Sequence, residues 1–242
     1  MAMGKHSDPN DDVTGDPVDD DFEGPFDIDD FDDAATAAMG RLDLGSVLIP
    51  MPEAGQVQVE LSEVGVPSAV WVVTPNGRFT IAAYAAPKSA GLWREVATEL
   101  ADSLRKDVPQ VNIEDGPWGR EVVGVSKPEP NLPAGVVRFI GVDGYRWMIR
   151  CVVNGPQDRI AVLAAEARNA LADTVVRRGE TPLPVRTPLQ VQLPEPMAAQ
   201  LAAAAEQAAM QQAQQAQQPP QPAARRSELG SAMQQLRTIT GG

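Results

Sequence analysis

The sequence predicts an α+β fold: a single domain with a mainly antiparallel sheet and two packed helices. A disordered acidic N-terminal arm precedes the domain, and a tail rich in proline, alanine and glutamine follows it. Three observations lead to this prediction. Short apolar runs of strand length give way twice to helical spacing, turn signals such as Asn76-Gly77 and Asp143-Gly144 separate the runs, and acidic residues gather at one end. Strands joined by tight turns favour antiparallel pairing over a doubly wound parallel sheet.

The first segment, residues 1–37, is predicted to be a disordered acidic arm. Residues 8–33 contain 13 acidic side chains and no basic one, whereas residues 34–242 contain 20 acidic and 19 basic side chains. Like-charge repulsion, with interspersed proline and glycine, leaves too little apolar surface to offset the entropy lost on ordering. The formal net charge of −13 is therefore a property of the arm.

Three phenylalanines and one isoleucine interrupt the acidic arm. They are Phe22, Phe26, Ile28 and Phe31. Spaced carboxylates can occupy a basic groove on a partner while aromatic rings fill apolar pockets, so these four residues are candidate partner contacts. A solubilising tail with incidental aromatic residues explains the same composition, and both interpretations stay open.

Two further interpretations of the arm are weaker. A calcium loop can be written from Asp19 onward, but its twelfth position is Asp30 rather than glutamate and its seventh is Pro25. Thr14 has acidic neighbours and is a candidate phosphorylation site, as any exposed threonine would be.

The domain itself is expected over residues 38–186. Its first strands have alternating or continuous apolar residues bounded by turn signals, at residues 57–61, 69–73 and 79–84. Apolar residues then recur at helical spacing from Leu92 to Leu104, with Ser89 as the expected N-cap. This helix should lie on the sheet.

The second half of the domain repeats the order of strands and then a helix. Its strands are expected at residues 111–113, 121–125, 135–142 and 145–153. After Gly155-Pro156, a second amphipathic helix is predicted to run to about Arg178, with Gly179 at its C-terminal end.

Three segments are expected after the domain. Residues 187–196 are rich in proline and should form an extended arm that adds an edge strand or crosses the surface, residues 197–218 should form an Ala/Gln-rich helix, and residues 219–242 should be a flexible tail. The tail contains a candidate docking helix. Its apolar residues are Leu229, Met233 and Leu236.

Composition argues against several kinds of site. The chain has one histidine, His6, and one cysteine, Cys151, so an intramolecular disulfide framework and a multi-thiolate zinc site are excluded. Cys151 lies in an expected strand and reads as a packed core residue rather than a reactive thiol. We expect no metal, no cofactor and no catalytic residue, although a missing motif does not exclude an enzyme.

The location and the partner class follow from charge and hydropathy. The sequence has no apolar run of 18 residues and no signal peptide, which predicts a cytoplasmic protein that does not engage a membrane. It has no visible cluster of Lys and Arg, so nucleic acid is not an expected partner. Oligomeric state is left open.

Two groups in turns remain as weaker candidates. Glu114, Asp115 and Asp143 could support acid–base chemistry, but turn formation already explains carboxylates at such positions. Trp118, beside Arg120 in a Gly-Pro-Trp-Gly turn, is a candidate exposed contact for a partner.

A family resemblance is carried by three runs, residues 40–50, 92–96 and 141–150. Over about residues 38–195 the chain resembles an actinobacterial family of uncharacterised proteins. The resemblance implies a bacterial cytosolic setting and brings no activity, ligand or catalytic residue. The order of hairpin, helix, strands and closing helix is also similar to the α+β fold of photosystem extrinsic subunits and Ran-binding nuclear import factors, a fold used mainly for docking.

These observations together predict a non-enzymatic intracellular protein-binding or adaptor protein, whose acidic aromatic-containing arm meets a basic surface of a protein partner. Two alternatives stay open. One is a small-molecule-binding domain or a carboxylate-dependent enzyme, and the other is a structural protein that oligomerises through its C-terminal helix.

Overall fold

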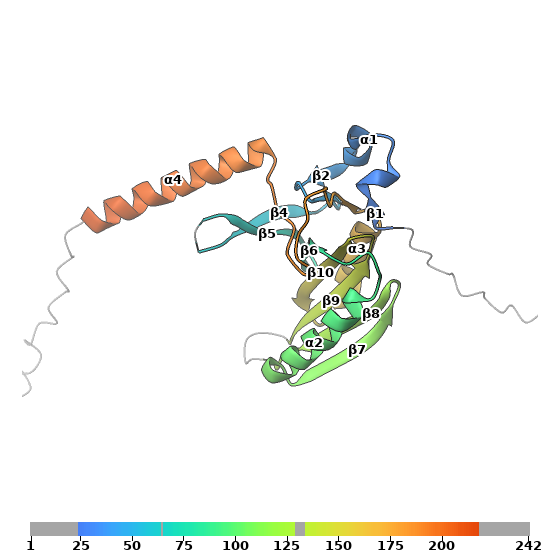
Figure 1. The fold of residues 1–242 in the computed structure, drawn as a ribbon. Coiled ribbons are helices and arrows are strands. Elements are labelled where there is room, and N and C mark those ends of the chain that lie inside the picture. The colour runs from blue at the N-terminus through green and yellow to red at the C-terminus, as the bar shows by residue number, and fades with distance from the viewer. Residues whose placement is uncertain (1–23, 64, 129–133, 218–242) are drawn as a thin grey trace, which may run out of the picture. The chain divides into compact units, whose positions relative to one another are not determined.

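The computed structural model describes residues 24–63, 65–128 and 134–217 of the chain (Figure 1). The chain divides into two units, of which the first ends at Leu193 and the second begins at Pro194. The first unit confirms the predicted α+β fold with a mainly antiparallel sheet.

A large antiparallel sheet is the centre of the first unit. In the described residues it has seven strands in the order β4-β5-β6-β10-β9-β8-β7. The strands are β4 (Gln56–Leu61), β5 (Pro67–Thr74), β6 (Gly77–Ala85), β7 (Gln110–Gly116), β8 (Gly119–Val125), β9 (Gly135–Asp143) and β10 (Trp147–Pro156). The expected hairpin at Asn76-Gly77 is confirmed, since β5 and β6 pair antiparallel on either side of it.

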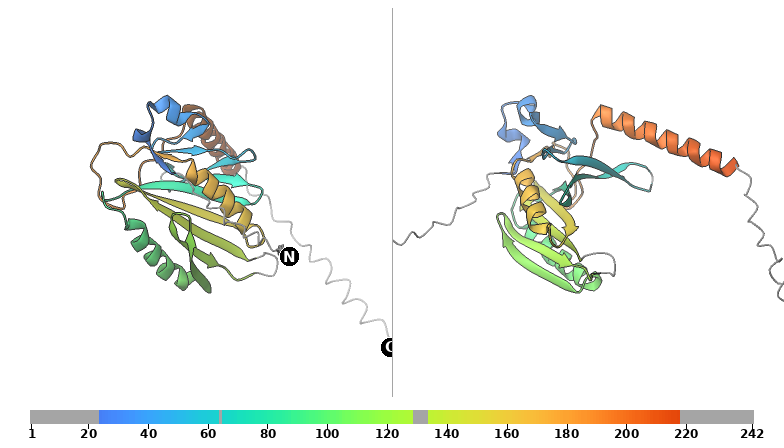
Figure 2. Two further views of the ribbon diagram at one scale, coloured as in Figure 1. Left: turned by 90° about the vertical axis from the view of Figure 1, so that its right-hand side faces the viewer. Right: turned by 180° about the vertical axis from the view of Figure 1, so that it is seen from behind.

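Two helices, α2 (Leu92–Asp107) and α3 (Ile160–Ala172), pack on opposite faces of this sheet. Successive side chains of a strand point to opposite faces, and β10 shows the division. Met148 packs in the cluster that contains α2, and its neighbour Ile149 packs in the cluster that contains α3. We call these sides the α2 face and the α3 face (Figure 2). The prediction of two packed helices is confirmed.

A smaller sheet lies in the same unit and was not predicted. Its order in the described residues is β1-β11-β3-β2, with β1 parallel to β11 and the other pairs antiparallel. The strands are β1 (Phe26–Asp27), β2 (Arg41–Asp43), β3 (Val47–Pro50) and β11 (Val175–Val176), and two short helices, η1 (Ile28–Asp30) and α1 (Ala34–Ala38), stand between β1 and β2.

Residues 24–37 therefore differ from the expectation of a disordered arm. Their carboxylates make local hydrogen bonds to the backbone: Asp27 caps η1 and Asp33 caps α1. Their apolar side chains pack together against Leu48 and Val175. The prediction of disorder rested on repulsion between these acidic side chains. In the structure, helix capping and the burial of apolar side chains order the same residues. Residues 1–23 lie outside the described part of the chain.

The end of the second long helix also differs from its prediction. α3 ends at Ala172 rather than near Arg178, and Val175 belongs to β11 instead of the helix stripe. The Thr174 hydroxyl donates back to the Ala170 carbonyl at 2.7 Å, and the following β-branched residues pair with β1 and β3. Val175 has the spacing of the apolar residues of α3, but its pairing with β1 and β3 places it in a strand.

The start of α2 is capped from a distant part of the chain. The Asp143 carboxylate, at the end of β9, accepts hydrogen bonds from the backbone N–H groups of Gly91 and Trp93, each at 2.9 Å. Ser89, the expected N-cap, does not serve, because the N-cap position is Gly91 in the left-handed region. The cap connects α2 to the β9–β10 turn.

The proline-rich segment extends the first unit. Leu189 donates from its N–H to the Ala83 carbonyl at 2.8 Å, and Ala85 donates to the Thr187 carbonyl at 2.8 Å, so the segment pairs with β6 where β5 has ended. These contacts are isolated bridges, such as Tyr84 with Pro188, rather than a regular strand among the described residues. The second unit contains α4 (Glu195–Gln217), where a helix was expected over 197–218. Residues 219–242 lie outside the described residues.

Candidate functional site

The base of the acidic arm is fixed to the domain at Gly24. The Trp118 indole Nε1–H donates to the Gly24 carbonyl at 2.7 Å. Gly24 has φ of +87°, and a Cβ added there would lie 2.2 Å from the Ala172 carbonyl oxygen at the end of α3. Only glycine fits this combination of backbone conformation and close approach. The chain therefore leaves the domain at a fixed point.

A second tryptophan holds the next turn of the arm. The Trp147 Nε1–H donates to Asp27 Oδ2 at 2.7 Å, while the Phe26 N–H donates to the Thr174 carbonyl at 2.9 Å. Phe26 and Phe31 meet edge to face with their ring centroids 5.8 Å apart. Two indole donors and a strand pairing thus hold residues that the sequence assigned to a free arm.

The residues predicted to contact a partner are divided by the structure. Phe26, Ile28 and Phe31 pack within the chain against Leu48 and Val175, so most of their apolar surface is used internally. Trp118 packs against the main core and is half-buried rather than exposed.

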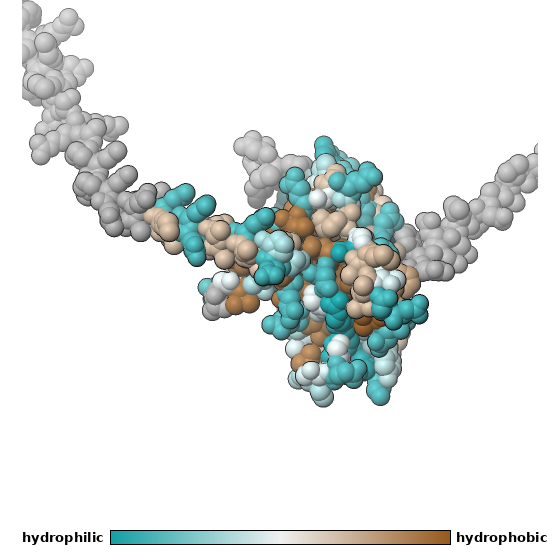
Figure 3. Space-filling model, turned by 90° about the horizontal axis from the view of Figure 1, so that it is seen from above, coloured by the Kyte–Doolittle hydropathy of each residue, from teal (hydrophilic) through white to brown (hydrophobic). Residues whose placement is uncertain are grey.

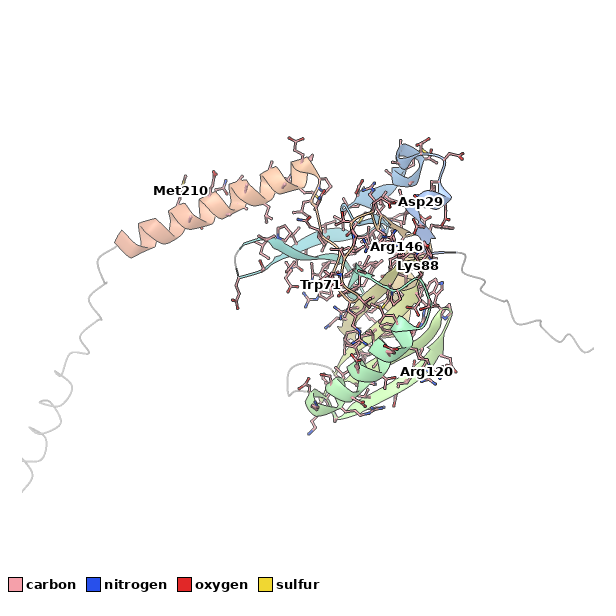
Figure 4. The ribbon with its side chains drawn as sticks, viewed as in Figure 1. Asp29, Trp71, Lys88, Arg120, Arg146 and Met210 are labelled. Atoms are coloured by element: carbon pink, nitrogen blue, oxygen red, sulfur yellow. The ribbon has the colours of Figure 1, made fainter. Side chains whose placement is uncertain are left out.

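Arg120 is exposed on the β7–β8 hairpin, as Figure 4 shows, and its carbonyl accepts a hydrogen bond from the Trp93 indole at 2.7 Å. The other predicted site residues lie outside the described part of the chain. They are Thr14, Phe22, Leu229, Met233 and Leu236.

The α3 face contains a buried ionic cluster that sequence reasoning missed. Glu121 of β8 is 1% exposed and accepts hydrogen bonds from Arg138 of β9 and from Arg168 of α3. Arg138 also reaches Glu114 of β7 at 2.7 Å. A buried carboxylate needs such partners because leaving water costs several kcal/mol. The cluster connects three strands to α3, and its charges are matched within the protein.

The remaining candidates for chemistry have structural roles. Glu114 pairs with Arg138, and Asp143 caps α2. Cys151 is fully buried, and burial, together with the nearby Glu121 charge, raises the pKa of its thiol. A thiol that stays protonated is a poor nucleophile, which fits the packed core residue predicted for Cys151. Within the described residues, no three His, Cys, Asp or Glu side chains are placed to hold a metal ion.

A groove of about 340 Å³ opens on the α2 face, between α2 and the sheet. The groove is lined by Tyr84, Val96, Glu99, Leu100, Ser103, Met148, Arg150 and Arg186. Arg150 of β10 lies with its guanidinium 5.0 Å from the centroid of the Tyr84 ring. Its Nε is buried and donates to no described residue. The sequence holds one signal of this site, an arginine in the middle of the apolar run that forms β10.

One protein-family model matches most of the chain. The family model described as a protein of unknown function, DUF3710, matches residues 24–200. The chain belongs to the DUF3710 family. The uncharacterised family expected from the sequence is thus confirmed, and the match begins at Gly24, where the structure fixes the chain to the domain. No curated protein matches this DUF3710 chain.

Two solved structures are similar to parts of the DUF3710 chain. One is a Bacteroides thetaiotaomicron VPI-5482 protein, with 15% identity and a TM-score of 0.36 over 60% of this chain and 51% of that one. The other is LpqN of Mycobacterium tuberculosis, described as involved in cell envelope biogenesis, with 14% identity and a TM-score of 0.32 over 54% of this chain and 83% of that one. At such scores neither protein's fold nor role is carried over. The likeness to photosystem extrinsic subunits and Ran-binding import factors stays a prediction.

Proposed function

We propose that this DUF3710 protein is a protein-binding protein that presents an acidic segment, residues 8–23, to a basic surface of a protein partner. The observation that carries the proposal is the fixed base of that segment, where Trp118 and Trp147 hold Gly24 and Asp27. A solubilising tail needs no fixed origin. A segment that must meet a partner surface gains from one, because a fixed origin raises its effective concentration near that surface.

The anchoring also sharpens which residues would meet the partner. Of the three phenylalanines and one isoleucine in the arm, three residues are packed on the domain, so Phe22 and the carboxylates before it remain for the contact. Eight of the 13 acidic side chains precede Gly24. Recognition by this segment would be mainly electrostatic, and therefore sensitive to salt.

The surface of the domain supports a role for charge. On the face that Figure 3 shows, apolar residues reach the surface in several small groups among hydrophilic ones. Exposed large apolar residues in the described part of the chain, such as Met39, Val66 and Tyr145, lie in separate loops. Among the described residues, no helix is long and apolar enough to cross a membrane. The cytoplasmic setting remains part of this proposal.

The test keeps the full chain and neutralises the segment. Asp16, Asp19, Asp20 and Asp21 are changed together to Asn, with a photo-reactive residue at Val18. The matched control neutralises four exposed carboxylates of the domain that make no ion pair with a described residue. They are Glu53, Glu63, Asp107 and Asp158.

Cross-linking in the native cell, followed by quantitative mass spectrometry, gives the readout. We expect a basic protein to be cross-linked at Val18, with at least about a tenfold loss in the segment variant and little loss in the control variant. Raising the salt concentration in an extract should weaken capture of the same protein. Equal cross-linking by both variants, or capture that salt does not change, would overturn the proposal.

A further inference from the structure

In the groove on the α2 face, the positive charge of Arg150 has no negatively charged partner among the described residues. Arg150 makes no ion pair with a described residue, and its polar contact is the face of Tyr84. Glu99, the carboxylate in the lining, is held by Arg186, whose guanidinium reaches both Glu99 oxygens at 2.8 and 3.0 Å and Glu95 at 3.3 Å. Arg186 and these two carboxylates therefore form a set of their own at the rim of the groove.

The stacking of Arg150 leaves its donors available to a ligand. A guanidinium over an aromatic ring is held by attraction to the ring face, while its N–H groups point outward in the plane of the fork. That fork matches a carboxylate, which can accept two parallel hydrogen bonds. The Arg150 side chain donates to no described residue. Its Nε is buried, as is the unpaired Nε of Arg138 in the ionic cluster, so the terminal N–H groups of Arg150 are the donors that a ligand in the groove would meet.

The walls of the groove indicate the size and polarity of the part of the ligand that does not contact Arg150. Tyr84 and Met148 come from the sheet, and Val96 and Leu100 come from α2, so an apolar body would contact apolar side chains on two sides. A volume of about 340 Å³ lies near the lower end of the ~300–1,000 Å³ found for small-molecule sites. A single unmatched guanidinium, with Glu99 at the rim, favours a ligand with one negative charge over a dianion.

We propose that this groove binds a small organic carboxylate with an apolar body, the carboxylate on Arg150 and the body between α2 and the sheet. This site is separate from the acidic segment and does not depend on its role. Octanoate is the probe, octanol is the neutral probe of the same length, and octyl phosphate is the dianionic one.

The measurement is NMR on the full chain labelled at the methionine methyl groups. Met148 lines the groove, so its methyl signal should shift on addition of octanoate. We expect octanol and octyl phosphate to bind at least about tenfold more weakly. Equal binding of octanoate and octanol would overturn the proposal, as would a Met148 signal that does not move.

A matched pair of arginine variants tests the charged contact. Arg150→Gln should weaken octanoate about tenfold or more and leave octanol unchanged. Arg78→Gln is the control, because Arg78 lies over the Trp71 ring at 4.5 Å in the same kind of stack, outside the groove lining. An equal loss in both variants would show that surface charge in general attracts octanoate, and the proposal would fail.

A second variant keeps the test valid if Arg150→Gln does not fold. Ser103 is exposed on α2 at the groove, so Ser103→Phe places a ring over the groove without disturbing the core. This variant should lose the octanoate-induced shift of Met148 while it keeps the unfolding midpoint of the wild type. Retained binding at full affinity would contradict the assigned position of the ligand. Neither result depends on cross-linking at residues 8–23, so the two proposals can fail independently.

Discussion

Each face of the large sheet contains a charged side chain, and the two charges differ in whether a residue of opposite charge pairs with them. On the α3 face, Glu121 is 1% exposed and two arginines match it. On the α2 face, Arg150 is half-buried and meets an aromatic ring instead of a carboxylate. Arg150 lies on the central strand β10, and Glu121 lies on β8, next to the edge strand β7. A charge matched within the protein contributes to the fold, whereas an unmatched one is available to a ligand.

The difference follows from how the helices cover the strands. α3 packs on β6 and β10 in the middle of the sheet, and the small sheet adjoins that side through β3. α2 packs on β7, β8 and β9, toward one edge. The α2 face of β6 therefore extends beyond the helix, and the groove forms where that cover ends, beside Tyr84.

The largest expected effect comes from breaking the matched charge on the α3 face. Glu121→Gln keeps the shape of the side chain but leaves Arg138 and Arg168 without their shared carboxylate, at 13% and 23% exposure. We expect a loss of roughly 3–5 kcal/mol in the free energy of unfolding, measured with urea.

The control for this variant is Glu114→Gln. Glu114 binds the same Arg138 but is 44% exposed, so its loss should cost less than about 1 kcal/mol. Similar losses for both variants would mean that burial does not decide the strength of this cluster.

Close packing on the covered part of the α2 face gives the next largest effect. A Cβ added at Gly141 of β9 would lie 1.9 Å from the Trp93 ring, which is buried and held by its hydrogen bond to the Arg120 carbonyl. Gly141→Ala should therefore lower the free energy of unfolding by roughly 1–3 kcal/mol.

Gly135→Ala in the same strand is the matched case. Its nearest neighbour for an added Cβ is the Ser126 hydroxyl oxygen at 3.3 Å, which accepts a hydrogen bond from the Gly135 N–H and need move by only a few tenths of an ångström. This variant should unfold close to the wild-type midpoint. If both alanines are tolerated equally, α2 is less firmly packed on β9 than its contacts indicate.

A smaller effect is expected where the arm meets the domain. Trp118→Phe keeps a ring in place but removes the donor to the Gly24 carbonyl, at a cost of about 1 kcal/mol. Hydrogen exchange of the Phe26 amide, which donates to Thr174, should become faster. Trp71→Phe removes an indole donor to Glu60 elsewhere and should leave that exchange unchanged. An unaltered Phe26 rate in both variants would show that Trp118 does not hold the arm.

The sequence was informative where structure is local. Periodicity and turn residues identified the β5–β6 hairpin, α2 and the strands from β4 to β10, because the residues that form them are near one another in the chain. The small sheet was not predicted from the sequence, because its strands are only two to four residues long and its pairs, such as Phe26 with Val175, are distant in sequence. A local sequence pattern does not indicate which distant residue a strand will pair with.

The candidate sites show the same limit. The charge total could not tell a carboxylate that caps a helix, such as Asp33, from one that only repels its neighbours. Arg150 is a single charge within an apolar run, and Glu121 follows Arg120 at the start of another. Which of them is matched depends on the residues that face it across the sheet, and only the fold supplies that information.

The smallest expected effect contrasts an exposed ion pair with the buried Glu121 cluster. Asp43 is 41% exposed and accepts hydrogen bonds from Arg177 at 2.9 and 3.0 Å and from the Gly45 N–H at 2.8 Å. Burial alone would raise the pKa of Asp43, but the hydrogen bonds from Arg177 and Gly45 outweigh it and hold this pKa below its usual value. Asp43→Asn should cost less than about 1 kcal/mol at neutral pH, because solvent screens an exposed pair.

The pH dependence of that small difference tests its origin. The folded pKa of Asp43 lies below the unfolded value of about 3.9, so its contribution is complete above the unfolded pKa and disappears as the pH falls through the folded one. The difference between wild type and Asp43→Asn should therefore be constant from pH 7 to about pH 5 and shrink as the pH falls below the unfolded pKa, measured by urea unfolding at each pH. A difference that persists unchanged at pH 2 would assign the effect to packing of the side chain rather than to its charge.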